Sequence, residues 1–427
     1  MSSTNMSLTK NKCRIPMFKT LAALAITLAS TTQAFALPSF ARQTGDSCDS
    51  CHVGSFGPQL TPHGMKFKLG GYTDSDGKKG HIPLSGMLIQ NYTHTSQGQE
   101  DLTADGFKAN NNIAIQEESL FVAGKWMDHV GSFAQATYSA IDRKVALDNT
   151  DIRYATEANL FGQQGVYGIS LNNNPTMQDP FNTLPAWRFP FTSSDLAPGP
   201  DAAPLLDDGV AGSAYGVTAY TQMKNGIYAE LGGYKSFSKS FLDDVNVGAD
   251  KKINGLAPYG RVAYYKDMHK QVYSVGLVGM YAKTRDYGTS GPDTKYSDIG
   301  IDGHYQFLGN RKRIISVDAS YINESQKPDG GSSQKLNQFN LAGSYYYDKT
   351  YGGTARIFNT SGLDGTADTN GLMLQADWTP FGKEDSPYAP LANVRVGLQY
   401  TLYNKLNGES SNASDADTLM AFIWAAL

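Results

Sequence analysis

The feature that most constrains the fold is an alternation of apolar and polar residues that recurs from about Ile82 to the end of the chain. In 298–307, for example, Ile299, Ile301 and Tyr305 are separated by polar or small residues, and 338–345 and 394–402 repeat this pattern. A period of two places successive side chains on opposite faces of a β-strand. The sequence therefore predicts a sheet with one apolar face and one polar face.

About sixteen such segments occur, each near the roughly 9–11 residues that a tilted membrane strand requires. Their predicted starts are residues 82, 112, 129, 149, 166, 212, 226, 258, 271, 297, 312, 336, 351, 371, 391 and 416. Short connections at 224–225, 267–270, 308–311 and 348–350 alternate with long ones near 96–111, 173–211, 238–257, 284–296, 323–335 and 404–415. Outer-membrane barrels have short periplasmic turns and long extracellular loops, whereas a soluble sandwich or propeller gives no reason for this alternation.

The composition agrees with a membrane barrel. Charged residues make up 18% of the chain, below the roughly 25% of soluble domains, and there are 44 glycines and 25 tyrosines. A mean hydropathy of −0.38 excludes a polytopic helical membrane protein. A net charge of −4 without a basic block argues against nucleic-acid binding. We predict an all-β, transmembrane antiparallel barrel of about sixteen strands over 81–427, with both ends on the periplasmic side and an aqueous lumen.

Two segments refine this barrel. The last one, 418–427, carries apolar residues on both faces, including Phe422 and Trp424, and its pairing with the first strand would close the barrel. The loop 173–211 contains seven prolines, which exclude regular pairing. Two interpretations of this loop stay open: it folds inward and narrows the pore, or it is exposed at the surface.

The N-terminus has the layout of a secretory signal peptide. Lys10, Lys12, Arg14 and Lys19 precede an apolar run over 21–29, and Ala34-Phe35-Ala36 follows as a small-residue cleavage pattern. The run is too short to cross a hydrocarbon core of roughly 30 Å. We predict that 1–36 is removed and that the protein is exported to the outer membrane of a Gram-negative bacterium.

The strongest motif is Cys48-Asp49-Ser50-Cys51-His52. C-x-x-C-H is typical of covalent c-type haem attachment, with both thiols on one porphyrin and His52 as the proximal iron ligand. A thioredoxin-like dithiol would need a strand–helix context that is absent here. A zinc site would need two more ligands, and a plain disulfide would not need His52. The motif occurs once, so we predict one haem on a cytochrome segment over 37–80.

The second axial ligand is open among His63, Met65, His81 and Met87. A thioether raises the haem potential relative to bis-imidazole ligation, which suits acceptance of electrons from a weak donor. We therefore rank Met87 first and His81 second.

A segment of about 45 residues is too small to bury a haem alone. We expect it to sit in, or at the periplasmic end of, the barrel lumen, giving an electron conduit across the outer-membrane lipid. Polar residues predicted to face this lumen could position a cation, tune the haem or simply contact water; they are Asp298, Asp302, His304, Asp318, Arg356, Asp377 and Arg395.

Short sequences flank the motif at 40–45 (Phe-Ala-Arg-Gln-Thr-Gly), 58–62 (Pro-Gln-Leu-Thr-Pro), 67–72 (Phe-Lys-Leu-Gly-Gly-Tyr), 82–87 and 92–95. Together with the motif they resemble the haem segment and first strand of fused monohaem cytochrome–porins, the outer-membrane iron(II)-oxidising cytochromes. The resemblance covers about 38–95. One departure is Gly64-Met65, where the family pattern leads us to expect Gly-Arg, so a charge near a haem propionate is missing.

This resemblance implies an iron(II) oxidoreductase that takes electrons from extracellular Fe(II) and passes them to a periplasmic c-type cytochrome. Outer-sphere transfer needs no tight iron site, so we assign no iron ligands. Other interpretations stay open: the same conduit with another donor or the reverse direction, and a plain diffusion porin with a structural or sensory haem. A peroxidase would need an acid–base pair that we do not identify.

Overall fold

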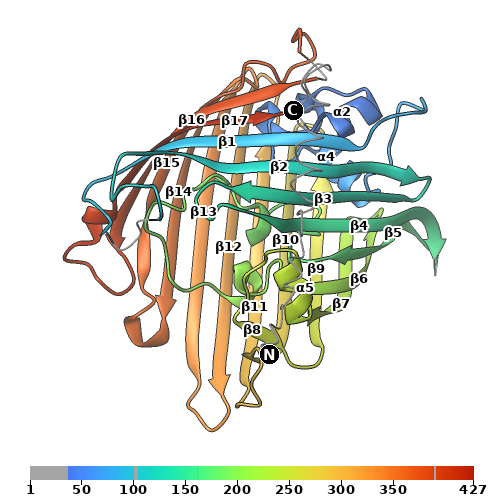
Figure 1. Ribbon diagram of the computed structural model, residues 1–427. Coiled ribbons are helices and arrows are strands. Elements are labelled where there is room, and N and C mark those ends of the chain that lie inside the picture. The colour runs from blue at the N-terminus through green and yellow to red at the C-terminus, as the bar shows by residue number, and fades with distance from the viewer. Residues whose placement is uncertain (1–36, 101–103, 161, 389–390) are drawn as a thin grey trace, which may run out of the picture. The chain divides into compact units, whose positions relative to one another are not determined.

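The computed structural model describes residues 37–100, 104–160, 162–388 and 391–427, so the predicted signal peptide over 1–36 lies outside the described residues. Sixteen long strands form one closed wall in this described part (Figure 1). They are β1 (Leu84–Thr95), β2 (Asn112–Met127), β3 (Val130–Ser139), β4 (Lys144–Leu160), β5 (Gln163–Asn172), β6 (Ala214–Met223), β7 (Ile227–Ser236), β9 (Ala257–Asp267), β10 (Gln271–Asp286), β11 (Thr294–Phe307), β12 (Arg313–Pro328), β13 (Gln334–Tyr347), β14 (Tyr351–Gly362), β15 (Thr369–Trp378), β16 (Asn393–Lys405) and β17 (Thr418–Ala426).

Each barrel strand pairs antiparallel with its neighbour in the chain, and the last pairs with the first. β17 lies against β1 from Met87↔Ala426 to Thr95↔Thr418. β7 pairs directly with β9, and the short β8 (Lys251–Ile253) is an extra strand on the extended end of β10. Closure leaves no unpaired edge, as a barrel in lipid requires. The predicted all-β antiparallel barrel is confirmed.

The predicted strand starts agree with the structure to within five residues, and the largest difference is at β4, which begins at Lys144 rather than 149. Two expected long loops, 284–296 and 323–335, are shorter than predicted. There β10 to β13 continue past the apolar alternation as polar paired strands, with Thr284 opposite Thr294 and Gln326 opposite Gln334. One connection on the short-turn end, between β15 and β16, is long, and it contacts the N-terminal segment through a hydrogen bond from Asp49 N to Gly382 O at 3.1 Å.

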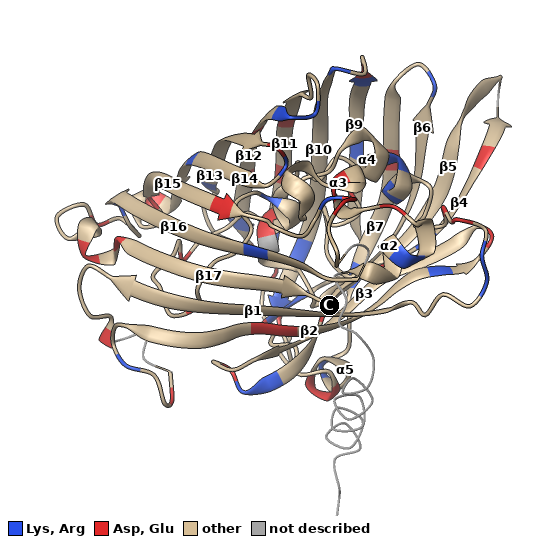
Figure 2. Cartoon of the chain, turned by 90° about the horizontal axis from the view of Figure 1, so that it is seen from above, with Lys and Arg blue, Asp and Glu red and all other residues tan. Residues whose placement is uncertain are grey.

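The outer face of the barrel is apolar. Val262, Leu277 and Ile301 pair with one another in the middle of three neighbouring strands and are 58%, 58% and 48% exposed. Exposed aromatic residues lie toward the short-turn end of the wall: Tyr305, Phe307, Tyr345, Tyr347, Tyr351 and Trp378. Figure 2 shows long stretches of strand without charged residues. An apolar band with an aromatic border fits a lipid bilayer.

This outer face predicts a stability effect. Replacing Leu277 by arginine should lower the free energy of unfolding by about 2–4 kcal/mol, because a charge at the middle of the lipid face must leave water. Urea unfolding in lipid vesicles would measure it, with Leu277→Ile as the control. Equal stabilities for the arginine and isoleucine variants would mean that this face does not contact lipid.

The N-terminal segment folds into short helices inside the short-turn end of the barrel: α2 (Pro38–Thr44), α3 (Cys48–Cys51), η1 (Val53–Ser55) and α4 (Pro62–Leu69) (Figure 2). The Thr61 hydroxyl caps α4 by accepting a bond from Gly64 N, and Pro62 occupies its first position. Gly54 has φ of 67°, and a Cβ there would collide with the Tyr346 ring of the wall. Ser55 Oγ donates to Lys349 O at 2.8 Å. Among the described residues, no helix is long and apolar enough to cross a membrane.

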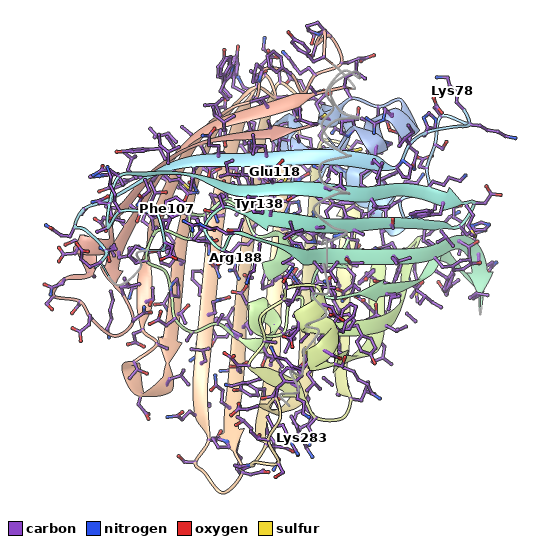
Figure 3. The ribbon with its side chains drawn as sticks, in the orientation of Figure 1. Lys78, Phe107, Glu118, Tyr138, Arg188 and Lys283 are labelled. Carbon is purple, nitrogen blue, oxygen red and sulfur yellow. The ribbon has the colours of Figure 1, made fainter. Side chains whose placement is uncertain are left out.

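The loop 173–211 folds inward, which decides between its two interpretations. Met177, Phe181, Leu184 and Leu206 are each at most 1% exposed. The wall holds the loop through side chains: Arg153 Nη2 donates to Gln178 O at 2.6 Å, and Gln399 Nε2 donates to Thr192 O at 3.1 Å. The loop contains η3 (Pro185–Trp187) and a π-helical turn, η4 (Leu205–Gly209). Figure 3 shows Arg188 of this loop in the barrel interior. The remaining short helices are α5 (Lys239–Asp244), η5 (Leu363–Gly365) and η6 (Ala413–Ala416).

Candidate functional site

The C-x-x-C-H motif forms the single turn α3 and the residue that ends it. His52 N donates to Cys48 O at 2.9 Å, and His52 itself has extended backbone. One helical turn therefore brings both thiols to the same side. Cys48, Cys51 and His52 all line one cavity of about 190 Å³, and both cysteines are free thiols.

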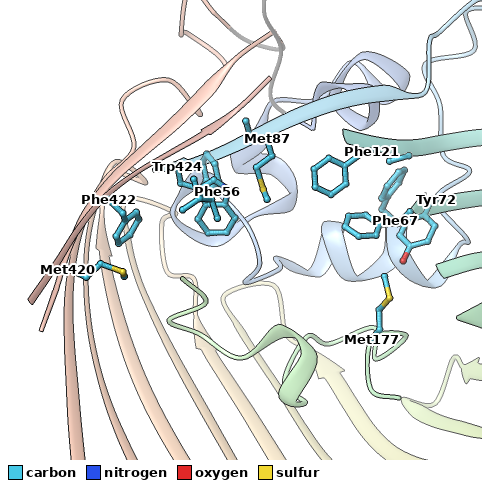
Figure 4. Close-up of a cluster of buried hydrophobic side chains, with 13 residues drawn as sticks. Phe56, Phe67, Tyr72, Met87, Phe121, Met177, Met420, Phe422 and Trp424 are labelled. Carbon is cyan, nitrogen blue, oxygen red and sulfur yellow. The ribbon is translucent and has the colours of Figure 1, made fainter. Parts of the chain in front are cut away.

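Aromatic side chains from three parts of the chain form the wall of this cavity, which we call the motif cavity. Figure 4 shows some of those from the N-terminal segment and the strands, among them Phe56, Phe121 and Trp424. Phe56 meets Trp424 edge-on with ring centroids 4.8 Å apart, and Phe191 stacks on Trp424 with ring centroids 5.7 Å apart. The aromatic lining residues are Phe40, Phe56, Phe67 and Tyr72 from the N-terminal segment, Phe121, Phe133 and Trp424 from the strands, and Trp187 and Phe191 from the inward loop. Such walls suit a large, flat, apolar ligand and exclude water.

Of the four candidates for a second axial ligand, only Met87 lines the motif cavity within the described residues; it is 8% exposed. His81 lies outside the cavity, and its Nε2 bonds to Asp76 Oδ1 at 3.0 Å. His63 Nε2 bonds to Asp46 Oδ2 at 2.8 Å, and Met65 packs in a different cluster with Leu60 and Leu69. The geometry thus favours the first-ranked candidate over the second.

The residues around the cavity fit a haem. The buried Nδ1 of His52 and Nε1 of Trp424 have no hydrogen-bond partner in the described chain. Burial, and then the Arg395 guanidinium, lower the pKa of His52 to about 4, so its imidazole is neutral and able to ligate iron. Burial also raises the pKa of Cys48 to about 11 and of Cys51 to about 12, which disfavours a thioredoxin-like thiolate.

The polar residues predicted to face the lumen all point inward, and two of them, Asp318 and Arg395, bind the N-terminal segment. Arg395 donates to Gly57 O at 3.1 Å and to Phe56 O at 3.3 Å, and its guanidinium lies over the Phe56 ring. His304 Nδ1 bonds to Asp318 at 2.5 Å, and the other Asp318 oxygen accepts from Gln59 Nε2. Arg395 and Asp318 thus hold this segment in the lumen, whereas Asp298 and Asp302 accept hydrogen bonds from Leu206 N and Thr183 Oγ1 of the inward loop.

Lys68 also lines the cavity and was missed by the sequence reasoning. Its Nζ donates to Met177 O and to Asn182 Oδ1, each at 2.7 Å, and lies 4.7 Å from the Trp187 ring centre. Lys68 therefore ties α4 to the inward loop. No signal in the sequence pairs a surface-type lysine with a loop more than a hundred residues away.

Lys68 predicts a pH effect on stability. Burial, and then Arg153, lower the pKa of Lys68 to about 7, although Asp151, Asp179 and Glu230 act in the opposite direction. Between pH 7 and about 10.4 the unfolded chain binds more protons at this position, so stability rises with pH by at most about 1.4 kcal/mol per pH unit. Urea unfolding at pH 7, 8 and 9 should show that the free energy of unfolding of wild type rises with pH relative to that of Lys68→Met. If the unfolding free energies of the two proteins changed equally with pH, Lys68 would stay charged in the folded protein.

A possible metal site shares one cysteine with the motif. Asp46, Cys51 and His63 each offer a ligand atom, all within 4.8 Å of one another. The sequence reasoning set zinc aside for lack of further ligands at close spacing, and the fold supplies two of them, Asp46 from the loop before α3 and His63 from α4. Cys51 cannot serve both a thioether bond and this cluster, so the two interpretations exclude each other.

No protein-family model matches the chain, and no curated protein matches it in sequence. Among solved structures, it is similar to an anion-selective porin from Comamonas acidovorans (12% identity, 80% of this chain and 98% of that chain, TM-score 0.48). It is also similar to OmpF of Salmonella typhi in complex with daunomycin (12%, 81% and 97%, TM-score 0.48) and to the channel DcaP of Acinetobacter baumannii (11%, 81% and 96%, TM-score 0.48). The assignment of a porin-like barrel rests on the strand pairing described above.

Proposed function

We propose that this protein is an outer-membrane electron-transfer protein that carries one covalent c-type haem in a porin-like barrel. It would accept single electrons from extracellular Fe(II) and pass them to a periplasmic c-type cytochrome. The observation that carries the proposal is the convergence of Cys48, Cys51, His52 and Met87 on one aromatic cavity inside the barrel.

In this proposal Cys48 and Cys51 hold the haem, His52 offers a neutral imidazole nitrogen, and Met87 offers a thioether sulfur. A bound c-type haem supplies one-electron oxidation and reduction. The aromatic walls exclude water from its faces, and the apolar outer face places the barrel in lipid, which insulates electrons.

The positions of the N-terminal segment and the inward loop at opposite ends of the barrel support the proposed direction of electron transfer. The N-terminal segment sits at the short-turn end, which in outer-membrane barrels faces the periplasm. The inward loop comes from the long-loop end, and its Trp187 and Phe191 line the motif cavity. A donor from outside would thus approach through the lumen, and a periplasmic carrier would approach the N-terminal segment.

A visible spectrum of the detergent-purified, air-oxidised protein, before and after anaerobic addition of Fe(II), tests this proposal. A reduced c-type spectrum after Fe(II) is the expected result. Reduction by dithionite but not by Fe(II) would favour another donor or electron export. A protein without haem that binds zinc would favour the cluster of Asp46, Cys51 and His63.

A second candidate is a diffusion porin with a structural haem, which the barrel fold alone would equally allow. Conductance in planar bilayers separates the two. The N-terminal segment and the inward loop both occupy the lumen, so we expect low conductance from wild type. Porin-like conductance with the segment in place would favour the diffusion porin.

Met87 predicts a spectroscopic change under this proposal. Replacing Met87 by alanine should make the oxidised haem high-spin and lower its reduction potential, because a thioether ligand favours the reduced iron. Redox titration with optical detection measures both. Met420→Ala is the matched control, since Met420 is buried in the same aromatic cluster but does not line the cavity. An unchanged spectrum in Met87→Ala would exclude Met87 as the ligand.

A further inference from the structure

A second and much smaller cavity lies farther into the lumen, between the inward loop and the wall. Its volume is about 20 Å³, enough for one water-sized occupant. The loop supplies Arg188, and β12 to β14 supply Asp318, Ser320, Asn340 and Arg356. Two guanidinium groups from distant parts of the chain thus face one small space, one of them the Arg188 group seen inside the barrel in Figure 3.

These two cations are not fully compensated. Arg356 donates Nε and Nη2 to the same neutral acceptor, Asn340 Oδ1, at 3.0 and 2.6 Å. Within the described part of the chain, no carboxylate lies within 4.0 Å of the Arg356 guanidinium. Arg188 Nη2 donates to Asp207 at 2.9 Å and to Gln338 at 2.8 Å, but its buried Nε has no acceptor among the described residues. The one carboxylate paired here, Asp207, thus contacts Arg188 and not Arg356.

The carboxylate that lines the cavity is already engaged elsewhere. One Asp318 oxygen bonds to His304 Nδ1 at 2.5 Å, and the other accepts from Gln59 Nε2 at 3.1 Å. Ser320 offers a hydroxyl on the same wall. Both arginines are half-buried, so each guanidinium is partly removed from water, and a charge-assisted hydrogen bond to an anion would offset the cost of that removal.

We propose that this cavity is a binding site for a small monovalent anion of the size of chloride, held between Arg188 and Arg356. A space for one water-sized occupant suits a monatomic anion better than phosphate or a carboxylate. Asn340 holds the Arg356 guanidinium in place on the wall. Asp207 and Gln338 hold the Arg188 guanidinium of the loop. The anion would therefore connect the inward loop to the wall. This inference is independent of whether a haem is bound.

Bromide replaces chloride and scatters X-rays anomalously, so it is a direct probe. Crystals of the full protein grown with sodium bromide should show an anomalous peak between the two guanidinium groups. The peak should be lost in Arg356→Gln and in Arg188→Gln, and retained in Arg285→Gln, whose arginine pairs with Asp293 at the rim. The variant crystal structures also report whether each barrel is folded.

A measurement in solution tests whether the anion binds at low salt and not only at the high bromide concentration of the crystals. The ³⁵Cl line width of dilute sodium chloride should broaden on addition of wild-type protein or Arg285→Gln, and much less on addition of Arg356→Gln. A water molecule in place of the bromide peak would overturn the proposal. Equal line broadening by all three proteins would overturn it as well.

Discussion

Replacing Cys48 and Cys51 together by serine is expected to abolish covalent haem attachment while leaving the barrel folded. Two thioether bonds are the only covalent link that the C-x-x-C-H motif makes to a porphyrin, so their loss is complete rather than partial. The fold should persist, because both side chains line a cavity and make no disulfide. Haem staining after denaturing electrophoresis measures attachment, and strand content by circular dichroism measures folding.

Ser50→Ala is the matched control, because Ser50 lies between the two cysteines and does not line the cavity. It should keep the stained band at wild-type intensity. A stained band that survives in the double serine variant would show that haem is attached elsewhere. Absence of the band from wild type, expressed with a haem-attachment system, would overturn the proposed function itself.

Replacing Arg261 by methionine should lower the free energy of unfolding by about 3–5 kcal/mol. Arg261 on β9 donates to both oxygens of Asp302 on β11, at 2.7 and 2.9 Å, and lies 3.3 Å from Asp179 on the inward loop. All three side chains are fully buried. Removing the guanidinium leaves the buried carboxylates of Asp302 and Asp179 without their shared counter-ion, and uncompensated buried charge is strongly destabilising. Urea unfolding followed by tryptophan fluorescence would measure the loss.

The double variant Arg261→Met/Asp302→Asn tests the cause. It removes one of the stranded charges, so it should recover part of the stability lost in Arg261→Met. Asp179 would keep Lys68 as a nearby cation. If the single variant were as stable as wild type, the inward loop would not be anchored through Arg261. If the double variant were less stable than the single one, carboxylate repulsion would not be the cause.

Local patterns were enough to predict the barrel. Alternation along one strand, such as Ile299, Ile301 and Tyr305, assigns each side chain to a face without knowledge of any other strand. The spacing of Cys48, Cys51 and His52 is likewise a local property, since one helical turn sets it. Proline content in 173–211 excluded strands there, but it did not determine where the loop would go.

The sequence by itself thus determined the strands, their faces, the closed barrel and the place of the C-x-x-C-H motif. Only the tertiary structure decided that the inward loop fills the lumen, that Met87 rather than His81 lines the motif cavity, and that Lys68 and Arg188 reach their partners. The physical reason is that a periodic pattern records which face a residue takes relative to its own strand. Which distant segment meets that face depends on how loops and helices pack in the closed barrel, and no short stretch of sequence encodes such packing.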